Sequence, residues 1–278
     1  MESPRWRAAS IEPPIQSFQT VTPLDAGGIL RPLPTRRSEA ILARSENRTK
    51  DQIRTLKFTR GFTDNPAGSV LVESGKTRVL CTVSIQESVP PWLQGSNQGW
   101  VTAEYSMLPG STNSRKPRDG RTGRVDGRSQ EIQRLIGRCL RGIIDTRKLP
   151  EVTLWVDCDV LSADGGTRTA AINGACVALH DALSSLNLKD WPMTNLVSAI
   201  SVGMVGGEPC VDLDYKEDHA ASVDLNVACI SDGRLVEVQG SAERSPFSHE
   251  QFLTMLDKAR TACQRIHELQ QEALEFGS

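Results

Sequence analysis

Hydrophobic and polar residues alternate in several short stretches of the chain. The clearest alternation lies in residues 78–85, where every second position is apolar and one face of a strand would be buried: Val79, Cys81, Val83 and Ile85. The apolar run 70–72 precedes it, and the turn-forming residues 73–76 between them predict a β-hairpin. Further strands are predicted at residues 152–156 (with a loop after it), 197–205, 211–215, 223–229 and 235–238.

Apolar residues recur with helical spacing in three other segments. The first begins at Ser129 and keeps the spacing i, i+3, i+4, i+7 as far as Ile144, which predicts an amphipathic helix ending at Leu149-Pro150. A second helix is predicted over residues 169–186, and a third begins at Ser248 with the capping-box order Ser-His-Glu-Gln. Strand hairpins followed by helices occur twice, which predicts an α+β fold of two sheet-and-helix halves.

The first 47 residues differ from the rest of the chain. They hold six of the fifteen prolines and show no hydrophobic period. We therefore expect residues 1–47 to be a flexible extension and residues 48–278 to form a single domain. The extension has no apolar core after its basic residues and contains several acids, which argues against a secretory signal and a transit peptide. The cytoplasm is the expected location, and the extension leaves an organelle open.

Composition excludes several classes of protein. Of the 278 residues, 38% are hydrophobic, which suits a soluble globular protein, and no apolar run is long enough to span a membrane. The seven cysteines are scattered without a CxxC pair, so we expect buried free thiols in a reducing compartment. The four histidines show no paired spacing, which argues against a histidine-based metal site.

The net charge of −2 conceals a strong asymmetry. Residues 115–148 contain eleven lysines and arginines against four acidic residues, whereas residues 208–278 contain six against fourteen. A basic block and an acidic block predict that one part of the protein holds a polyanion and another gathers cations. Ordinary variation of surface charge is the alternative.

Two glycine-containing segments could bind anions at helix N-termini. One is Gly127-Arg128-Ser129, and the other is 163–169, where Gly165 and Gly166 precede Thr167 and Arg168. Neither is a Walker A loop or a GxGxxG fingerprint, so a nucleoside triphosphate or dinucleotide site is not supported. Each segment could also be a plain turn with a solvated arginine. No GxSxG elbow or Cys/His pair indicates nucleophilic catalysis.

Five carboxylates fall within thirteen residues: Asp212, Asp214, Glu217, Asp218 and Asp224. A solvated rim is the commoner reason for such a cluster. Asp224, however, lies in an alternating strand whose apolar residues face one side, which places Asp224 and Asn226 together on the other. Carboxylates near a bound phosphate suit a hard cation such as Mg²⁺ or Mn²⁺, which would neutralise charge during phosphoryl transfer.

Four motifs resemble those of the bacterial ribonuclease PH family, in order and with few gaps from about Arg48 to the last helix. They are Gln98-Gly-Trp-Val-Thr-Ala-Glu-Tyr-Ser-Met-Leu-Pro109, Gln130-Glu-Ile-Gln-Arg-Leu-Ile-Gly-Arg138, Asp157-Cys-Asp-Val-Leu-Ser-Ala-Asp-Gly-Gly-Thr-Arg-Thr169 and Glu237-Val-Gln-Gly240. The resemblance implies a phosphorolytic 3′→5′ exoribonuclease, a nucleotidyltransferase that trims the 3′ ends of transfer RNA precursors and of other RNAs. Inorganic phosphate is the co-substrate, and nucleoside diphosphates are released.

The resemblance also implies the roles of individual residues. Arg128 and the stretch Gly166-Thr167-Arg168 would hold the attacking phosphate. Asp218 and Asp224 match the acidic pair implicated in binding Mg²⁺ or Mn²⁺ and in protonating the leaving 3′ oxygen. Basic residues at Arg115 and Arg118 resemble those that guide the RNA. The family has a ribosomal protein S5 domain 2-like fold and assembles as a hexameric ring, a trimer of dimers, so we expect a homohexamer.

The chain departs from the family pattern at three places. Gly110 stands where an arginine is usual, Asp126 brings a carboxylate near Arg128, and Ser45-Glu-Asn-Arg48 replaces the usual Arg-Pro-Asp-Gly-Arg. The carboxylate of Asp126 would either oppose phosphate binding or pair with Arg124. Two other functions therefore stay open. One is a catalytically silent, RNA-binding ring subunit of an exosome-like assembly, and the other is a hydrolase of a non-RNA substrate on the same fold.

Overall fold

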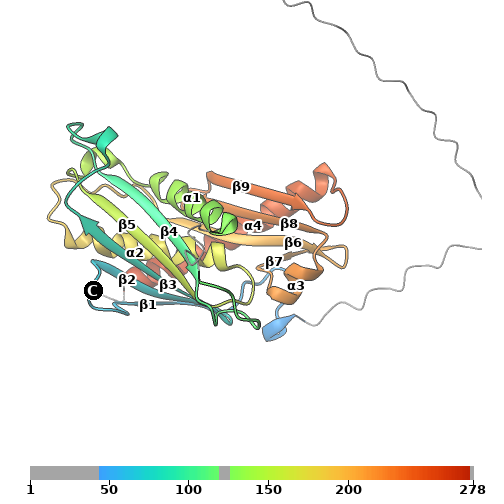
Figure 1. Ribbon diagram of the computed structural model, residues 1–278. Coiled ribbons are helices and arrows are strands. Elements are labelled where there is room, and N and C mark those ends of the chain that lie inside the picture. Colours follow the sequence, from blue (N-terminus) through green and yellow to red (C-terminus); the bar gives the residue numbers. More distant parts are fainter. Residues whose placement is uncertain (1–43, 119–125, 276–278) are drawn as a thin grey trace, which may run out of the picture. The chain divides into compact units, whose positions relative to one another are not determined.

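The structure is a computed structural model that describes residues 44–118 and 126–275 (Figure 1). Residues 1–43 of the predicted extension lie outside the described residues. The boundary between extension and domain at residue 47 stays a prediction. Within the described residues the fold is α+β, with two sheets and four α-helices, as the alternating and helical patterns predicted. None of these helices is both long and apolar enough to cross a bilayer.

The first half of the fold is a five-stranded sheet with the strand order β1-β2-β3-β5-β4. Neighbouring strands are antiparallel, except that β4 and β5 run parallel. The predicted hairpin is β2 and β3, and its apolar face is buried. The strands are β1 (Leu56–Arg60), β2 (Gly68–Ser74), β3 (Thr77–Gln86), β4 (Trp100–Met107) and β5 (Thr153–Ser162).

The second half is a four-stranded antiparallel sheet with the order β7-β6-β8-β9. β8 lies inside this sheet, paired to β6 on one side and β9 on the other, so that its residue Asp224 is positioned by backbone pairing on both sides. The strands are β6 (Val197–Val205), β7 (Glu208–Val211), β8 (Val223–Ile230) and β9 (Leu235–Ala242).

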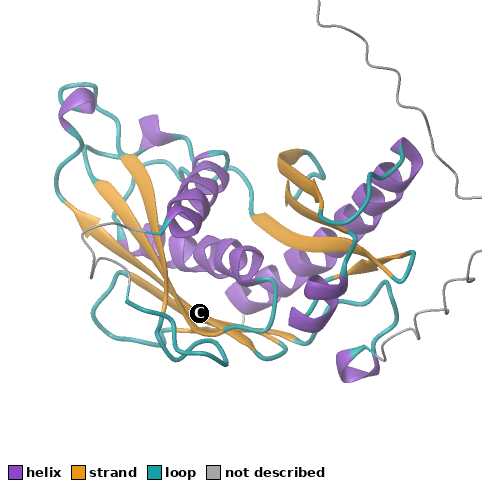
Figure 2. Cartoon of the chain, turned by 45° about the vertical axis from the view of Figure 1, so that its right-hand side comes forward, coloured by secondary structure: helices purple, strands orange, loops and turns teal. Residues whose placement is uncertain are grey.

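The helices are α1 (Gly127–Arg141), α2 (Thr167–Ser185), α3 (Tyr215–Ala220) and α4 (His249–Glu275). Figure 2 shows α2 between the two sheets, and it contacts β2, β3 and β6. The side chain of Asn173 joins this helix to the second sheet, since it accepts from Ala199 N at 2.7 Å and donates to Ala199 O at 3.0 Å. The burial of α2 fixes its N-terminus firmly with respect to both sheets.

Two details of the sequence prediction are confirmed. Ser248 and Gln251 form the capping box at the start of α4, each backbone N–H bonding to the other side chain. All seven cysteines are buried and free, as their scattered apolar positions predicted.

Three element boundaries were predicted wrongly. Residues 157–162 continue β5 and are not a loop, because Cys158 and Val160 extend the buried face of the strand. Of the segment 211–215 only Val211 is in a strand, as the last residue of β7: Asp212, with φ of 56°, follows it, and Asp214 caps α3. α1 ends at Arg141 instead of near Leu149, since the chain leaves the helix at Gly142 and forms a β-bridge to Met193 at Ile144.

Candidate active site

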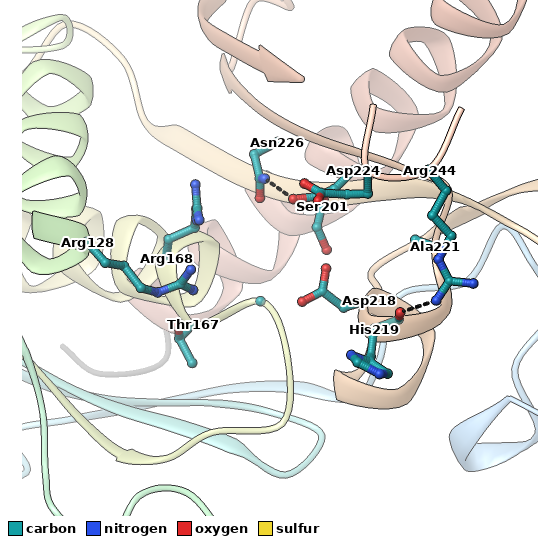
Figure 3. A pocket seen from close by; sticks show the side chains of 12 residues that line it. Arg128, Thr167, Arg168, Ser201, Asp218, His219, Ala221, Asp224, Asn226 and Arg244 are labelled. Atoms are coloured by element: carbon teal, nitrogen blue, oxygen red, sulfur yellow. Dashed lines mark hydrogen bonds between the residues drawn. The ribbon is translucent and has the colours of Figure 1, made fainter. Parts of the chain in front are cut away.

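Six of the predicted site residues line one cleft of about 480 Å³: Arg128, Gly166, Thr167, Arg168, Asp218 and Asp224 (Figure 3). The cleft has a cationic wall built by the N-termini of α1 and α2. Its opposite wall carries carboxylates from α3 and β8. Long stretches of sequence separate the two walls, so only the folded chain brings these groups together. The rest of the lining is Ser201, His219, Ala221, Asn226, Glu243 and Arg244.

The cationic wall combines two arginines with two helix N-termini. Arg128 lies in the first turn of α1 and Arg168 in the first turn of α2. Neither first turn contains an acidic residue, and the N-cap residues Asp126 and Gly166 make no side-chain capping hydrogen bond. The partial positive charge of each helix N-terminus therefore adds to the two guanidinium charges. This wall favours an anion, and a phosphate fits both the charge and the donors.

The loop before α2 has a conformation that requires glycine. Gly165 and Gly166 have φ values of 77° and 64°, in the left-handed region. A Cβ atom on Gly165 would lie 2.5 Å from the carbonyl oxygen of Leu213. Thr77 of the first sheet holds the loop in place, since its hydroxyl donates to Gly165 O at 2.7 Å and accepts from Asp164 N at 2.9 Å. The N-terminus of α2 is thus held rigidly at the cleft.

Neighbouring side chains orient the two polar residues of this helix turn. The hydroxyls of Thr167 and Tyr105 are hydrogen-bonded at 2.8 Å. Arg168 donates through Nη1 to Gln239 Oε1 at 3.0 Å, and the same nitrogen lies 3.5 Å from Glu131 Oε1. Both contacts use one nitrogen of a group with five N–H donors, so donors remain for an anion in the cleft. Arg168 is therefore preorganised by β9 and α1.

The carboxylate wall consists of Asp218 on α3 and Asp224 on β8. Burial raises the pKa of Asp218, although Arg128 and Arg168 across the cleft act to lower it. Burial and the nearby charge of Asp218 raise the pKa of Asp224 to about 6. The side chain of Asn226 donates to Asp224 Oδ2 at 3.0 Å, as their shared strand face predicted. The buried Oδ1 atom of Asp224 has no hydrogen-bond partner within the described residues.

The neighbouring carboxylate Asp212 has a supporting position instead. Arg54 binds it through three nitrogens: the backbone N–H donates to Oδ2 at 2.7 Å, Nε to Oδ2 at 3.1 Å, and Nη2 to Oδ1 at 2.7 Å. Burial acts to raise the pKa of Asp212, but Arg54 holds that pKa below its usual range. Arg54 also donates through Nη1 to Asp164 O at 2.7 Å. One buried ion pair therefore joins the carboxylate segment to the glycine loop.

Asp214 and Glu217 support the short helix that carries Asp218. Asp214 accepts from the backbone of Glu217 at 3.0 Å, and Glu217 accepts from Asp214 N at 3.0 Å, which completes a capping box. Glu217 is buried and forms ion pairs with two arginines. Its Oε1 atom lies 2.6 Å from Arg44 Nε, and its Oε2 atom lies 3.5 Å from Arg48 Nη2. Three of the five clustered carboxylates thus hold the backbone in place, and two face the cleft.

Two models of one known family match this chain. The model of the 3′ exoribonuclease family, domain 1, matches residues 52–184, and that of domain 2 matches residues 195–262. The chain belongs to this ribonuclease PH family. The cationic wall lies in the domain 1 segment and both cleft aspartates lie in the domain 2 segment. The family assignment made from sequence motifs is confirmed.

Three solved structures have a similar fold. A rice (Oryza sativa) Rrp46 matches with a TM-score of 0.68 over 83% of this chain and 100% of that chain. An Archaeoglobus fulgidus exosome with RNA bound to its active site matches with a TM-score of 0.69 over 82% and 92%, and an archaeal exosome core with 0.66 over 81% and 89%. Each is 21% identical to this chain, so these likenesses establish the ribonuclease PH-like fold.

Two predicted residues of the ribonuclease PH site lie apart from the cleft. Arg115 and Arg118 are exposed in the segment before α1 and do not line it. Their assignment as RNA guides stays a prediction. Asp126 forms an ion pair with Lys116, with Oδ2 and Nζ 3.2 Å apart. Arg124, the partner that the sequence offered, lies outside the described residues. The carboxylate near Arg128 is therefore at least partly neutralised by a lysine.

Several residues of the cleft show no signal in the sequence. Ser201 on β6, His219 on α3, and the adjacent residues Glu243 and Arg244 after β9 carry no motif that resembles a site. The backbone N–H groups of Glu243 and Arg244 both bond to Ser222 O. This pairing of the segment after β9 with Ser222, just before β8, holds both residues beside the cleft.

The carboxylate wall suits a hard divalent cation. Carboxylate oxygens are the ligands that Mg²⁺ and Mn²⁺ prefer, and the Oδ1 atom of Asp224 lacks a partner within the described residues. Among the residues that the structure describes, no group of three or more histidine, cysteine, aspartate or glutamate residues is arranged to hold a metal. Two carboxylates with water and phosphate oxygens are, however, a common way of binding Mg²⁺. The residues present therefore fit such an ion.

Proposed function

We propose that this protein is a phosphorolytic 3′→5′ exoribonuclease. The observation that carries the proposal is the single cleft in which a cationic wall faces two carboxylates of raised pKa. Phosphorolysis needs both: an anion subsite for the attacking phosphate, and a group that manages charge at the leaving oxygen. Membership of the ribonuclease PH family supports the same chemistry.

In the proposed reaction, Arg128 and the α2 N-terminus at residues 166–168 hold inorganic phosphate. One of its oxygens attacks the phosphorus of the last phosphodiester, and the bond from that phosphorus to the 3′ oxygen of the preceding nucleotide breaks. The products are a nucleoside 5′-diphosphate and an RNA one nucleotide shorter. Fixed guanidinium and backbone N–H groups lower the barrier because they stabilise the charge of the phosphoryl groups without reorganising.

The leaving 3′ oxygen needs a proton, which the carboxyl pair can supply. Asp224 suits this role because its pKa of about 6 leaves a fraction of the group protonated near neutral pH. In its ionised form the pair would instead hold Mg²⁺ or Mn²⁺, which would neutralise negative charge beside the reacting phosphates. Asp218 lies on the carboxylate wall, and the charges of both arginines on the opposite wall act to lower its pKa.

The substrate that we propose is the 3′ end of an RNA, with transfer RNA precursors as the first candidates. The cytoplasm is the location that we propose, and a homohexamer is the assembly that the family resemblance favours. The solved structures of similar fold support a ring of several subunits equally well, because two of them are archaeal exosomes. The assembly is testable by measuring the mass of the purified protein in solution.

A second candidate function is that of a catalytically silent RNA-binding subunit in an exosome-like ring. The observation that favours it is the likeness to the exosome structures, together with Gly110 at the position where an arginine was expected. The intact cleft favours activity instead, because both arginines and both aspartates line it together.

One experiment separates the two functions. The purified protein is incubated with Mg²⁺ and a short RNA carrying a single-stranded 3′ tail, with and without inorganic phosphate, and the products are resolved. An active enzyme shortens the RNA only with phosphate and releases nucleoside diphosphates. Shortening without phosphate, with release of monophosphates, would contradict phosphorolysis. RNA binding without shortening under either condition would favour the silent subunit.

A further inference from the structure

The carboxylate side of the cleft has one arginine of its own in the lining. Arg244 follows β9 and is exposed, and Figure 3 shows it on the side of Asp218, across the cleft from Arg128 and Arg168. The other two arginines of the lining belong to the helix N-termini that the proposed function assigns to inorganic phosphate. Arg244 has no part in that subsite.

The position of Arg244 is fixed at two points. Its backbone N–H bonds to Ser222 O at 3.2 Å, next to the bond from Glu243 N to the same oxygen at 3.0 Å. Its side chain donates through Nη2 to the carbonyl oxygen of His219 at 2.9 Å. A guanidinium has five N–H donors, so this single bond orients the group and leaves donors for a ligand. The arginine is thus anchored at the mouth of the cleft.

The surroundings of Arg244 create a need for a cation. Asp218, Asp224 and Glu243 all line the cleft, and Glu243 acts to raise the pKa of both aspartates. An RNA strand that enters the cleft brings a phosphodiester group with every nucleotide. These phosphates would be repelled by the carboxylates unless a positive charge lay beside their path.

We propose that Arg244 binds a phosphodiester of the RNA, as a second anion subsite separate from the inorganic phosphate subsite of Arg128 and Arg168. The proposal rests on the proposed function, in that it assigns the RNA backbone to the same cleft. The subsite takes the phosphate group and not the base, so it acts on all sequences alike.

A positioning role is the competing explanation, because Arg244 bonds to His219 on the helix that carries Asp218. Two variants separate the roles. Arg244→Gln keeps a side-chain N–H for the His219 carbonyl and removes the charge, whereas Arg244→Lys keeps the charge. Arg234→Gln is the matched control, since Arg234 is exposed, lies in the turn before β9 and pairs with Asp232 outside the cleft.

Binding of a fluorescent 3′-tailed RNA is measured without inorganic phosphate over a range of salt concentrations. We expect Arg244→Gln to weaken binding about fivefold to tenfold, and to reduce the slope of log K against log salt concentration by about 0.7. Arg244→Lys and Arg234→Gln should stay within about twofold of the wild type. In turnover, Arg244→Gln should raise the KM for RNA and leave the KM for phosphate unchanged.

A substrate with one neutral methylphosphonate linkage tests the contact itself. A series of RNAs carries the neutral linkage at a different position near the 3′ end in each. At one position the substitution should weaken RNA binding by the wild type but leave RNA binding by the Arg244→Gln variant unchanged. Unchanged RNA affinity and salt slope in Arg244→Gln would overturn the proposal, as would a raised KM for phosphate alone. If the wild type shows no phosphorolysis but Arg244→Gln still loses RNA affinity, the proposed function fails and the RNA subsite stands.

Discussion

Asp212 and Asp224 lie twelve positions apart in one acidic segment and have opposite environments. Asp212 is fully paired with Arg54, and its pKa is held low. Within the described residues, Asp224 forms no ion pair and its Oδ1 atom has no hydrogen-bond partner, and its pKa is raised to about 6. The first carboxylate holds the fold together, and the second is destabilising where it lies. Such a cost is typical of a group retained for function.

The same change of charge should therefore have opposite effects at the two positions. Asp212→Asn leaves the buried guanidinium of Arg54 without its counterion, and breaking a buried ion pair from one side costs about 3–5 kcal/mol. We expect the free energy of unfolding, measured by urea denaturation at pH 7, to fall by that amount. Asp232→Asn, in an exposed ion pair, is the control and should change it by less than about 1 kcal/mol. A similar loss in both variants would contradict the supporting role of Asp212.

A substitution in the cationic wall should lower the rate of phosphorolysis strongly. Arg168→Ala removes a preorganised charge from the proposed phosphate subsite, and losing one such group costs about a hundredfold to a thousandfold in rate. We expect phosphorolysis to fall by this factor, with RNA binding nearly unchanged. Arg234→Ala, outside the cleft, should have wild-type activity. Full activity in Arg168→Ala would remove the phosphate assignment.

Asp224→Asn should stabilise the protein. The folded-state pKa of about 6 lies above the ordinary value of 3.8, so the folded chain loses stability as pH rises from about 4 to 6 and Asp224 becomes charged. The asparagine has no such charge, and at pH 7 we expect a gain of about 1–2 kcal/mol in the free energy of unfolding. The gain should disappear below pH 4, where both side chains are neutral. A loss of stability at pH 7 would make Asp224 a supporting residue like Asp212.

A smaller effect is expected in the affinity for Mg²⁺, measured by calorimetry without RNA. Since a divalent cation competes with the proton of Asp224, the dissociation constant should rise about tenfold for each unit of pH below about 6. Above pH 6 it should level off. A constant affinity for Mg²⁺ between pH 5 and pH 7 would show that the ion does not bind to this carboxyl pair.

The sequence could predict some of the groups that line the cleft but none of the contacts that support it. Alternation within β8 placed Asp224 and Asn226 on one face, and their hydrogen bond bears this out. Asp218 lies on α3, a helix of six residues, which is too short to show a hydrophobic period. The partners of Asp212 and Glu217, Arg54 and Arg44, are more than 150 positions away in the chain. No local pattern reveals such pairs.

The cleft also shows why the acidic cluster could not be interpreted from composition alone. Five carboxylates close in sequence favoured either a solvated rim or a cation site, and the structure divides them between support and cleft. That division depends on the turn at Asp212, whose φ of 56° ends the strand that the sequence predicted through residue 215. The turn directs the following residues into α3 and toward the cleft.

The rate of nucleoside diphosphate formation by Asp224→Asn tests the account most directly. It is measured with a 3′-tailed RNA, phosphate and Mg²⁺, at a temperature where the denaturation curve shows both proteins folded. We expect a rate at least about a hundredfold below the wild type in a variant that is no less stable, because the change removes a charge-managing group and relieves its burial. A rate within about twofold of the wild type would contradict the assignment of this carboxylate to catalysis.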